Sequence, residues 1–197
     1  MSEQERPIRQ IDYDRYQAFI EEFRGESDRA AVILGAAKID LLLYQILEAY
    51  LLPSPSGKDE LLDGEAPLST FSSKINIAHR LCLIDGPFAR MLHLIRKVRN
   101  SFAHEVSGCT LSSGSHSDRV KEMSLPLRHM DFYIRFKGVF FPNDSSPSAD
   151  FRATLAVVVA RLEHFLLHIN SVKQPFSLPL INPSWKEIVP DNVEKNA

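Results

Sequence analysis

The sequence lacks the features of several common protein classes. Its two cysteines, Cys82 and Cys109, form no CxxC pair. Two isolated cysteines without a signal-peptide pattern are typical of free thiols in a reducing cytosol, and they favour no structural zinc site. No uninterrupted apolar run reaches the ~18 residues that cross a bilayer. We therefore expect a cytoplasmic protein without a membrane segment.

Sequence motifs for cofactors and for common catalytic centres are also missing. The chain has no P-loop, Rossmann fingerprint, GxSxG or HExxH pattern. Two of its seven histidines, His164 and His168, stand four apart, but such a pair is more typical of a solvated helix face than of a metal site. The pattern predicts no cofactor and no metal.

The chain also lacks a net positive charge. The formal net charge is −2, and no helix-turn-helix recognition helix is evident. A dedicated DNA-binding domain usually carries a basic footprint over much of its surface. Any contact with nucleic acid is therefore expected to be local.

What the chain does contain is enough apolar sequence for one all-α domain. Hydrophobic residues make up 44% of its 197 residues. Their helical spacing predicts a bundle of four to six helices, with short loops favouring antiparallel neighbours. Helices are expected over 12–23 and 27–52, from Ser69, from Asp85 to about Glu105, over 118–125, and from 148 or 150 to about 172. Residues 128–141 alternate in polarity, so their assignment as strand or helix stays open.

The predicted organisation is a helical domain over residues 12–172. Residues 1–11 form a flexible N-terminus, and the Pro-rich tail 173–197 is expected to be extended, packed on the surface or loose. The helix over 27–52 is apolar on nearly all sides, which predicts burial on more than one side. Its excess apolar surface favours a homodimer.

The strongest candidate site lies on the helix that ends near Glu105. Arg96, Asn100 and His104 stand four apart and share a face, with Arg99 beside them. In the functional interpretation Arg99 neutralises a phosphate group and His104 transfers protons. Asn100 orients either the Arg99 or the His104 side chain. A purely structural alternative has Asn100 and His104 capping and terminating the helix, and Arg99 paired with a carboxylate such as that of Asp28 or Asp40.

A second charged cluster precedes the apolar helix. Arg24 and Arg29 are candidate binding residues that would extend the cationic site, with Asp28 or Glu26 supporting Arg99. The alternative is that these residues only cap the helix and form local ion pairs.

Three separated blocks resemble one known family. They read FRGESDRAAVILGAA over 23–37, DELLDGEAPLSTFSSKI over 59–75 and LIRKVRNSFAHE over 94–105. They resemble the mannitol operon repressor (MtlR-like) family. The resemblance implies an all-helical protein that regulates transcription of genes for mannitol use. Because no DNA-binding motif is evident, it also implies repression through a partner protein.

A shorter resemblance concerns the candidate site alone. The spacing Arg99-x4-His104 is similar to the Rx4–6H motif of HEPN domains, helical modules that dimerise and often act as metal-independent ribonucleases. It implies that Arg99 and His104 are a catalytic pair assisted by Asn100. Three hypotheses follow: a regulator, a ribonuclease, or a dimeric module that binds a nucleotide, RNA or another protein. Exposure of Arg99 and His104 in a cleft favours the ribonuclease, and burial of His104 disfavours it.

Overall fold

The computed structural model describes residues 21, 23–55, 57–105 and 108–172. These residues form six α-helices and no strand, which confirms the predicted all-α bundle. The helices are α2 (Asp28–Tyr50), α3 (Phe71–Arg80), α4 (Gly86–His104), α5 (Gly114–Ser124), α6 (Asp131–Phe140) and α7 (Pro147–His168), with a 3-10 turn over Leu125–Leu127. The predicted termini 1–11 and 173–197, and most of the helix expected over 12–23, lie outside the described residues.

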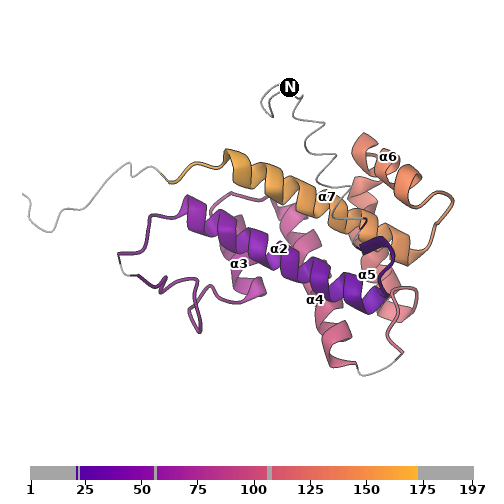
Figure 1. Ribbon diagram of the computed structural model, residues 1–197, viewed down its shortest axis with the longest axis horizontal. Coiled ribbons are helices and arrows are strands. Elements are labelled where there is room, and N and C mark those ends of the chain that lie inside the picture. Colours follow the sequence, from indigo (N-terminus) through magenta and orange to yellow (C-terminus); the bar gives the residue numbers. More distant parts are fainter. Residues whose placement is uncertain (1–20, 22, 56, 106–107, 173–197) are drawn as a thin grey trace, which may run out of the picture.

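The two longest helices, α2 and α7, lie side by side and run parallel (Figure 1). At one end Arg152 of α7 donates to Asp28 of α2 at 3.0 Å. At the other end the amide of Val172 donates to the carbonyl of Tyr50 at 2.7 Å. The pair is therefore fixed at both ends by contacts between residues more than a hundred positions apart.

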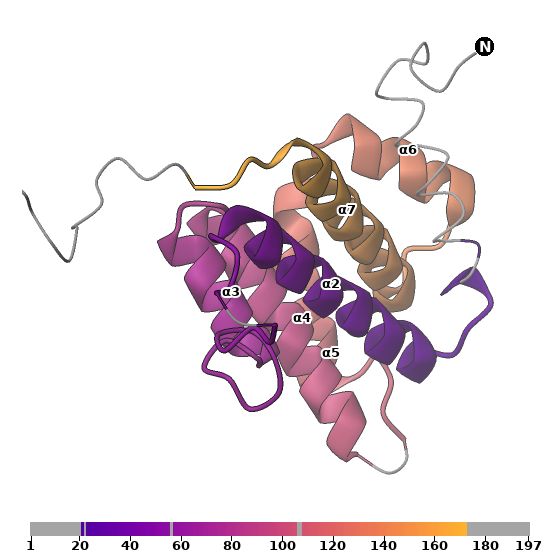
Figure 2. The ribbon, with the colours of Figure 1, turned by 60° about the vertical axis from the view of Figure 1, so that its left-hand side comes forward.

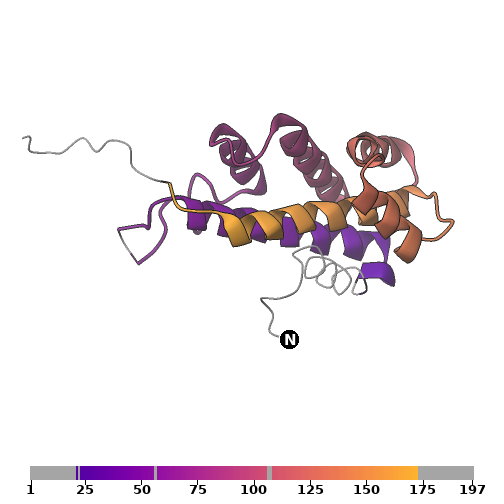
Figure 3. The same cartoon turned by 90° about the horizontal axis from the view of Figure 1, so that it is seen from above.

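Helices α3, α4 and α5 form a second layer on one side of this pair (Figure 3). The five residues 81–85 connect α3 to α4, and the short connection makes these helices antiparallel neighbours, as expected. Asn76 of α3 is 3.0 Å from His93 of α4. Helix α4 is also antiparallel to α2, because Arg29 at the start of α2 reaches the carbonyl of Glu105 just after α4.

Capping residues fix most helix starts where the sequence predicts them. Ser27 caps α2 by accepting from the amide of Ala30 at 3.2 Å. Asp85 caps α4 by accepting from the amide of Phe88 at 2.8 Å, and Pro87 occupies the first turn.

Three helix starts differ from the predicted positions. The N-cap of α3 is Thr70 rather than Ser69, since the Thr70 hydroxyl accepts from the amide of Ser73. Helix α5 begins at Gly114 rather than at residue 118. Helix α7 begins at Pro147 because Ser146 provides the cap, and it ends at His168 rather than near 172.

The ambiguous segment 128–141 contains α6, so it is a helix and not a strand. Phe132, Phe136 and Phe140 are spaced four apart, with ring centroids 6.0 and 4.6 Å apart. Tyr133 and Lys137 share another helix face, and both reach Asp150 of α7. Of the alternating apolar residues that resembled a strand, Phe132 and Phe136 lie on one helical stripe, whereas Ile134 is 54% exposed.

The apolar helix α2 is the centre of the core. Its buried side chains lie on one broad side, within about 160° of the helix circumference, rather than on several sides as predicted. They are Ala31, Val32, Ala36, Ile39, Leu42, Leu43, Ile46 and Leu47. Among the described helices it alone is long and apolar enough to cross a membrane, and half of that apolar window is buried inside the structure. Leu34 and Leu41 stay about half exposed.

A polar network around Asp28 connects three parts of the fold. Its carboxylate accepts hydrogen bonds from the Ser148 hydroxyl at 2.6 Å, from Arg152 and from the backbone amide of Leu111 at 3.1 Å. Arg152 is buried and also donates to the carbonyl of Glu26 at 2.7 Å. Burial raises the pKa of Asp28, but these hydrogen bonds and the Arg152 charge outweigh burial and lower the pKa below its ordinary value.

We expect Asp28→Asn to lower the free energy of unfolding by about 2 kcal/mol. This is less than the 3–5 kcal/mol typical of a fully buried pair, because the Asp28 side chain is 23% exposed. A depressed folded-state pKa contributes stability above the unfolded pKa of about 3.9, and this contribution is lost as pH falls through the folded pKa. Denaturant unfolding of the wild type and Asp28→Asn should be measured at pH 7 and in acid. The difference between their free energies of unfolding should be smaller in acid. Glu122→Gln, in the exposed pair with Arg90, is the control and should cost under about 0.5 kcal/mol.

The close approach of α2 and α7 gives a second prediction. A Cβ on Gly35 would lie 2.4 Å from Cδ1 of Leu155, a fully packed side chain. Overpacking costs about 1–3 kcal/mol, more than the ~1 kcal/mol that alanine gains over glycine in a helix. We expect Gly35→Ala to be destabilising by about 1 kcal/mol. Gly138→Ala in α6, where the new Cβ meets nothing within 4 Å, should be stabilising by about 0.5–1 kcal/mol. If thermal unfolding showed the same change in stability for Gly35→Ala and Gly138→Ala, the close contact between Gly35 and Leu155 would be contradicted.

Candidate functional site

A hollow of about 540 Å³ lies between α2, the start of α3 and the second half of α4. We call it the basic groove. Its lining comprises Ala36, Ala37, Asp40, Leu41, Tyr44, Thr70, Phe71, Ser72, Lys74, Arg96, Arg99 and Asn100. The structure therefore brings together three of the predicted site residues, Arg96, Arg99 and Asn100.

The apolar side of α4 determines which of its residues reach this groove. Ile95, Val98 and Phe102 have no exposed surface and hold the helix against the core. Arg96 and Asn100, four residues apart, then share the opposite side of the helix. Burial of one stripe thus presents the polar stripe to the groove.

Neither arginine of the groove is neutralised by a carboxylate in the described residues. Arg99 donates to the side-chain oxygen of Asn100 at 3.1 Å. Nε of Arg96 is buried and has no hydrogen-bond partner there. A buried donor without a partner costs free energy until a ligand or water accepts from it. The groove consequently holds two cationic groups that are available to an anion.

The structural alternative for Arg99 is wrong about its partners. Asp28 binds Arg152, and Asp40 pairs with Lys74 at 2.7 Å, so neither holds Arg99. Lys74 is buried, and its ammonium lies 5.9 Å from the Tyr44 ring centroid. The Asp40–Lys74 pair is neutral overall, and the two arginines keep their charge uncompensated.

The positive charge along α4 also acts on a neighbouring histidine. Burial lowers the pKa of His93, and the charges of Arg96, Lys97 and Arg90 lower it further. His93 is therefore neutral at pH 7. The positive charge of this helix face comes from its arginines and lysine.

His104 is exposed at the last position of α4 and is not among the residues that line the groove. Five residues along a helix correspond to about 7.5 Å of rise and about 140° of rotation, so His104 and Arg99 start from different sides of α4. Both are exposed, as the ribonuclease hypothesis requires. Within one chain, however, the groove gathers Arg99 with Arg96 and Asn100 rather than with His104.

The other two candidate arginines have different surroundings. Arg29 binds the carbonyls of Phe102 and Glu105, and so satisfies acceptors that the C-terminus of α4 leaves unpaired. Arg24 lines a separate hollow of about 420 Å³ together with Arg152. Arg29 thus holds the helix end that carries His104, and Arg24 does not enter the basic groove.

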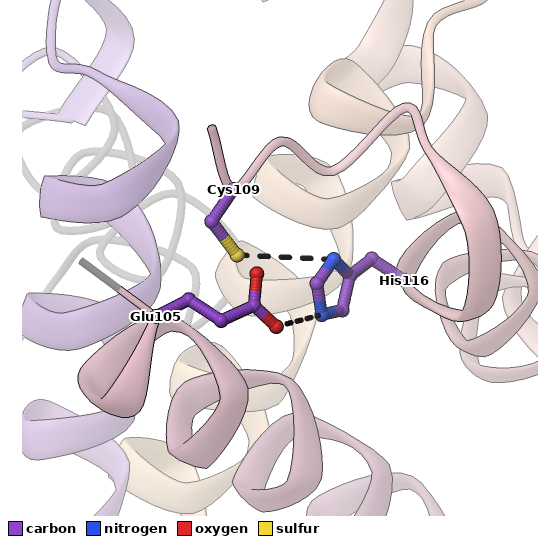
Figure 4. A group of neighbouring side chains, drawn as sticks. All are labelled: Glu105, Cys109 and His116. Atoms are coloured by element: carbon purple, nitrogen blue, oxygen red, sulfur yellow. Dashed lines mark hydrogen bonds and ion pairs between the residues drawn. The ribbon is translucent and has the colours of Figure 1, made fainter. Parts of the chain in front are cut away.

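A further cluster was missed in the sequence: Glu105, Cys109 and His116 (Figure 4). Oε1 of Glu105 lies 3.9 Å from Nε2 of His116, and Sγ of Cys109 lies 3.9 Å from Nδ1. The spacings of four and seven residues match no common motif. Only the turn between α4 and α5 brings the three side chains together, so no sequence pattern indicates this cluster.

Cys109 is not activated as a nucleophile. Burial, a hydrogen bond to Glu105 and the charge of Glu105 raise the pKa of Cys109 to about 11. Reactive cysteines require a lowered pKa, because the thiolate is the attacking species. The nearby histidine therefore does not make this cluster a Cys–His catalytic pair.

The basic groove remains the best candidate site on geometry. Comparison of the chain with family models, curated proteins and solved structures found no match. Two guanidinium groups, the Asn100 amide and the hydroxyls of Thr70 and Ser72 converge on one hollow. This set of donors can bind an anion with several oxygens, such as a phosphate group.

Proposed function

We propose that the chain is a cytoplasmic transcription-regulatory protein of the mannitol operon repressor type, which acts by binding and through a protein partner. Its likeness to that family in three sequence blocks supports the regulatory role. The observation that carries the binding role is the pair of arginines, Arg96 and Arg99, without a carboxylate partner in the described part of the groove.

The ligand that best fits the groove carries a phosphate group. An arginine presents its donors in a planar fork that matches two phosphate oxygens, and Arg96 still has a buried Nε without an acceptor. A volume of about 540 Å³ is within the range of small-molecule sites. Binding there would couple a phosphate-bearing ligand to the surfaces of α2, α3 and α4.

A homodimer is part of the proposal. Leu34 and Leu41 are exposed on α2, and Leu41 also lines the groove. Apolar side chains in such positions favour contact with another protein surface. A partner placed on α2 would therefore lie beside the ligand.

The regulatory role can be tested by complementing a deletion strain. We expect deletion of the gene to derepress the mannitol uptake genes, and wild-type protein to restore repression. A variant carrying Arg96→Gln and Arg99→Gln should fail to restore it, because the groove loses both charges. Lys97→Gln, an exposed α4 residue outside the groove, is the matched control and should restore repression. Unchanged transcript levels after deletion would exclude this role.

A second candidate function is metal-independent RNA cleavage, since Arg99 and His104 are both exposed, although only Arg99 lines the basic groove. In this mechanism His104 deprotonates a ribose 2′-hydroxyl or protonates the leaving oxygen. Arg99 stabilises the charge of the phosphorane that forms. Arg99 and His104 start from different sides of α4. The catalytic pair would therefore combine Arg99 of one chain with His104 of a second copy.

This alternative predicts that purified protein cleaves mixed RNA in the presence of a chelator. His104→Ala should reduce the rate by about 10²–10⁴-fold, the usual contribution of a general acid or base. His129→Ala, at an exposed histidine outside α4, controls for general damage. Absence of cleavage by the wild type would remove the enzymatic alternative and leave the binding role. Equal cleavage by the wild type and His104→Ala would assign the activity to a contaminant.

A further inference from the structure

The cluster of Glu105, Cys109 and His116 has the composition of a metal site. Glu105 directly follows α4, Cys109 lies in the connection that follows, and His116 is the third residue of α5. Figure 4 shows the two groups facing the two nitrogens of the imidazole ring: the Cys109 sulfur faces Nδ1 and the Glu105 carboxylate faces Nε2. One ligand atom from each residue lies within 4.8 Å of the other two. Oxygen, sulfur and nitrogen donors thus meet in one place.

The imidazole is already oriented for coordination. Nδ1 of His116 lies 3.2 Å from the carbonyl of Thr110, which can only accept, so this nitrogen carries the hydrogen. In the neutral imidazole Nε2 then carries the free lone pair, and it lies 3.9 Å from Oε1 of Glu105, too far for a hydrogen bond. A backbone carbonyl that fixes the tautomer in this way is the usual outer-shell partner of a metal-binding histidine.

The surroundings of the histidine keep this orientation. His116 is only 8% exposed, and its ring packs against Phe102 at 5.1 Å between centroids. Phe102 is itself fully buried. Few alternative rotamers are open to a ring held between a buried phenylalanine and a backbone acceptor, which lowers the entropy cost of binding an ion.

We propose that Glu105, Cys109 and His116 bind one Zn²⁺ ion and leave its fourth position open to water. Zinc accepts carboxylate, thiolate and imidazole together, at about 2.0–2.3 Å, which places ligand atoms about 3.5 Å apart in a tetrahedron. The present separations, all within 4.8 Å, exceed this value by at most about 1.3 Å. A rotation of the Cys109 thiol toward the Nε2 side of the ring would close the site.

This inference is independent of the basic groove and of the proposed function. The zinc would link the end of α4 to the start of α5, next to the carbonyls that Arg29 already binds. Three protein ligands with one open position are typical of zinc sites that bind an exogenous ligand or water rather than of closed structural sites.

The test is titration of the chelator-treated full chain with Zn²⁺ and, separately, with Co²⁺. We expect one ion per chain, a higher melting temperature with zinc, and a thiolate-to-cobalt charge-transfer band in the near ultraviolet. Cys109→Ser should abolish the band and weaken zinc binding by more than the ~10–100-fold that outer-shell changes cause. Cys82→Ser should bind like the wild type, because Cys82 is exposed and precedes the opposite end of α4.

Glu105→Gln is a second variant, useful if Cys109→Ser fails to fold. It keeps the sulfur and should therefore retain the charge-transfer band while binding zinc more weakly. Failure of the wild type to bind zinc would overturn the proposal. Zinc binding that is equal in Cys109→Ser, without a charge-transfer band in the wild type, would also overturn it and would point to another ligand set, such as His164 with His168.

Discussion

Two consecutive charged residues at the start of α2 hold the bundle together. Asp28 fixes the first turns of α7 through Ser148 and Arg152, and fixes the segment before α5 through the Leu111 amide. Arg29, the next residue, binds the carbonyls at the end of α4. Adjacent residues on a helix point about 100° apart. Asp28 and Arg29 can therefore contact α7 and the layer of α3, α4 and α5 from the same turn of α2. The buried arginine and its carboxylate stabilise the fold only as a complete network, since either charge alone would remain desolvated.

This arrangement explains why the groove residues stay available. Every carboxylate within the network or the core is already engaged: Asp28 by Arg152, Asp40 by Lys74, and Asp150 by Arg128 and Lys137. Arg96 and Arg99 are held in place by the buried stripe of α4 rather than by a counter-charge. The guanidinium groups of Arg96 and Arg99 are thus positioned by packing, and they can bind an anion without first breaking an ion pair.

Local chemistry in the sequence predicts much of the fold and part of the site. The spacing of apolar residues and the caps Ser27 and Asp85 specify α2 and α4, and the four-residue spacing of Arg96 and Asn100 places them on one face. Tertiary partners decide the rest. The helix α6 within residues 128–141 is held by Tyr133 and Lys137, which both meet Asp150. The Glu105–Cys109–His116 cluster depends on how the chain turns between two helices. No local pattern encodes such contacts, so the sequence alone left the first ambiguous and the second unseen.

The parallel pairing of α2 with α7 also has a consequence for how the chain is made. Asp28 and Arg152 are separated by 124 positions, so the central helix pair cannot close until nearly the whole domain has been synthesised. At a typical 5–20 residues per second, α2 waits roughly 6–25 s after its own synthesis before its partner emerges. During that interval the part of the apolar side of α2 that α7 covers in the folded domain stays exposed, because α3 and α4 pack against only part of that side.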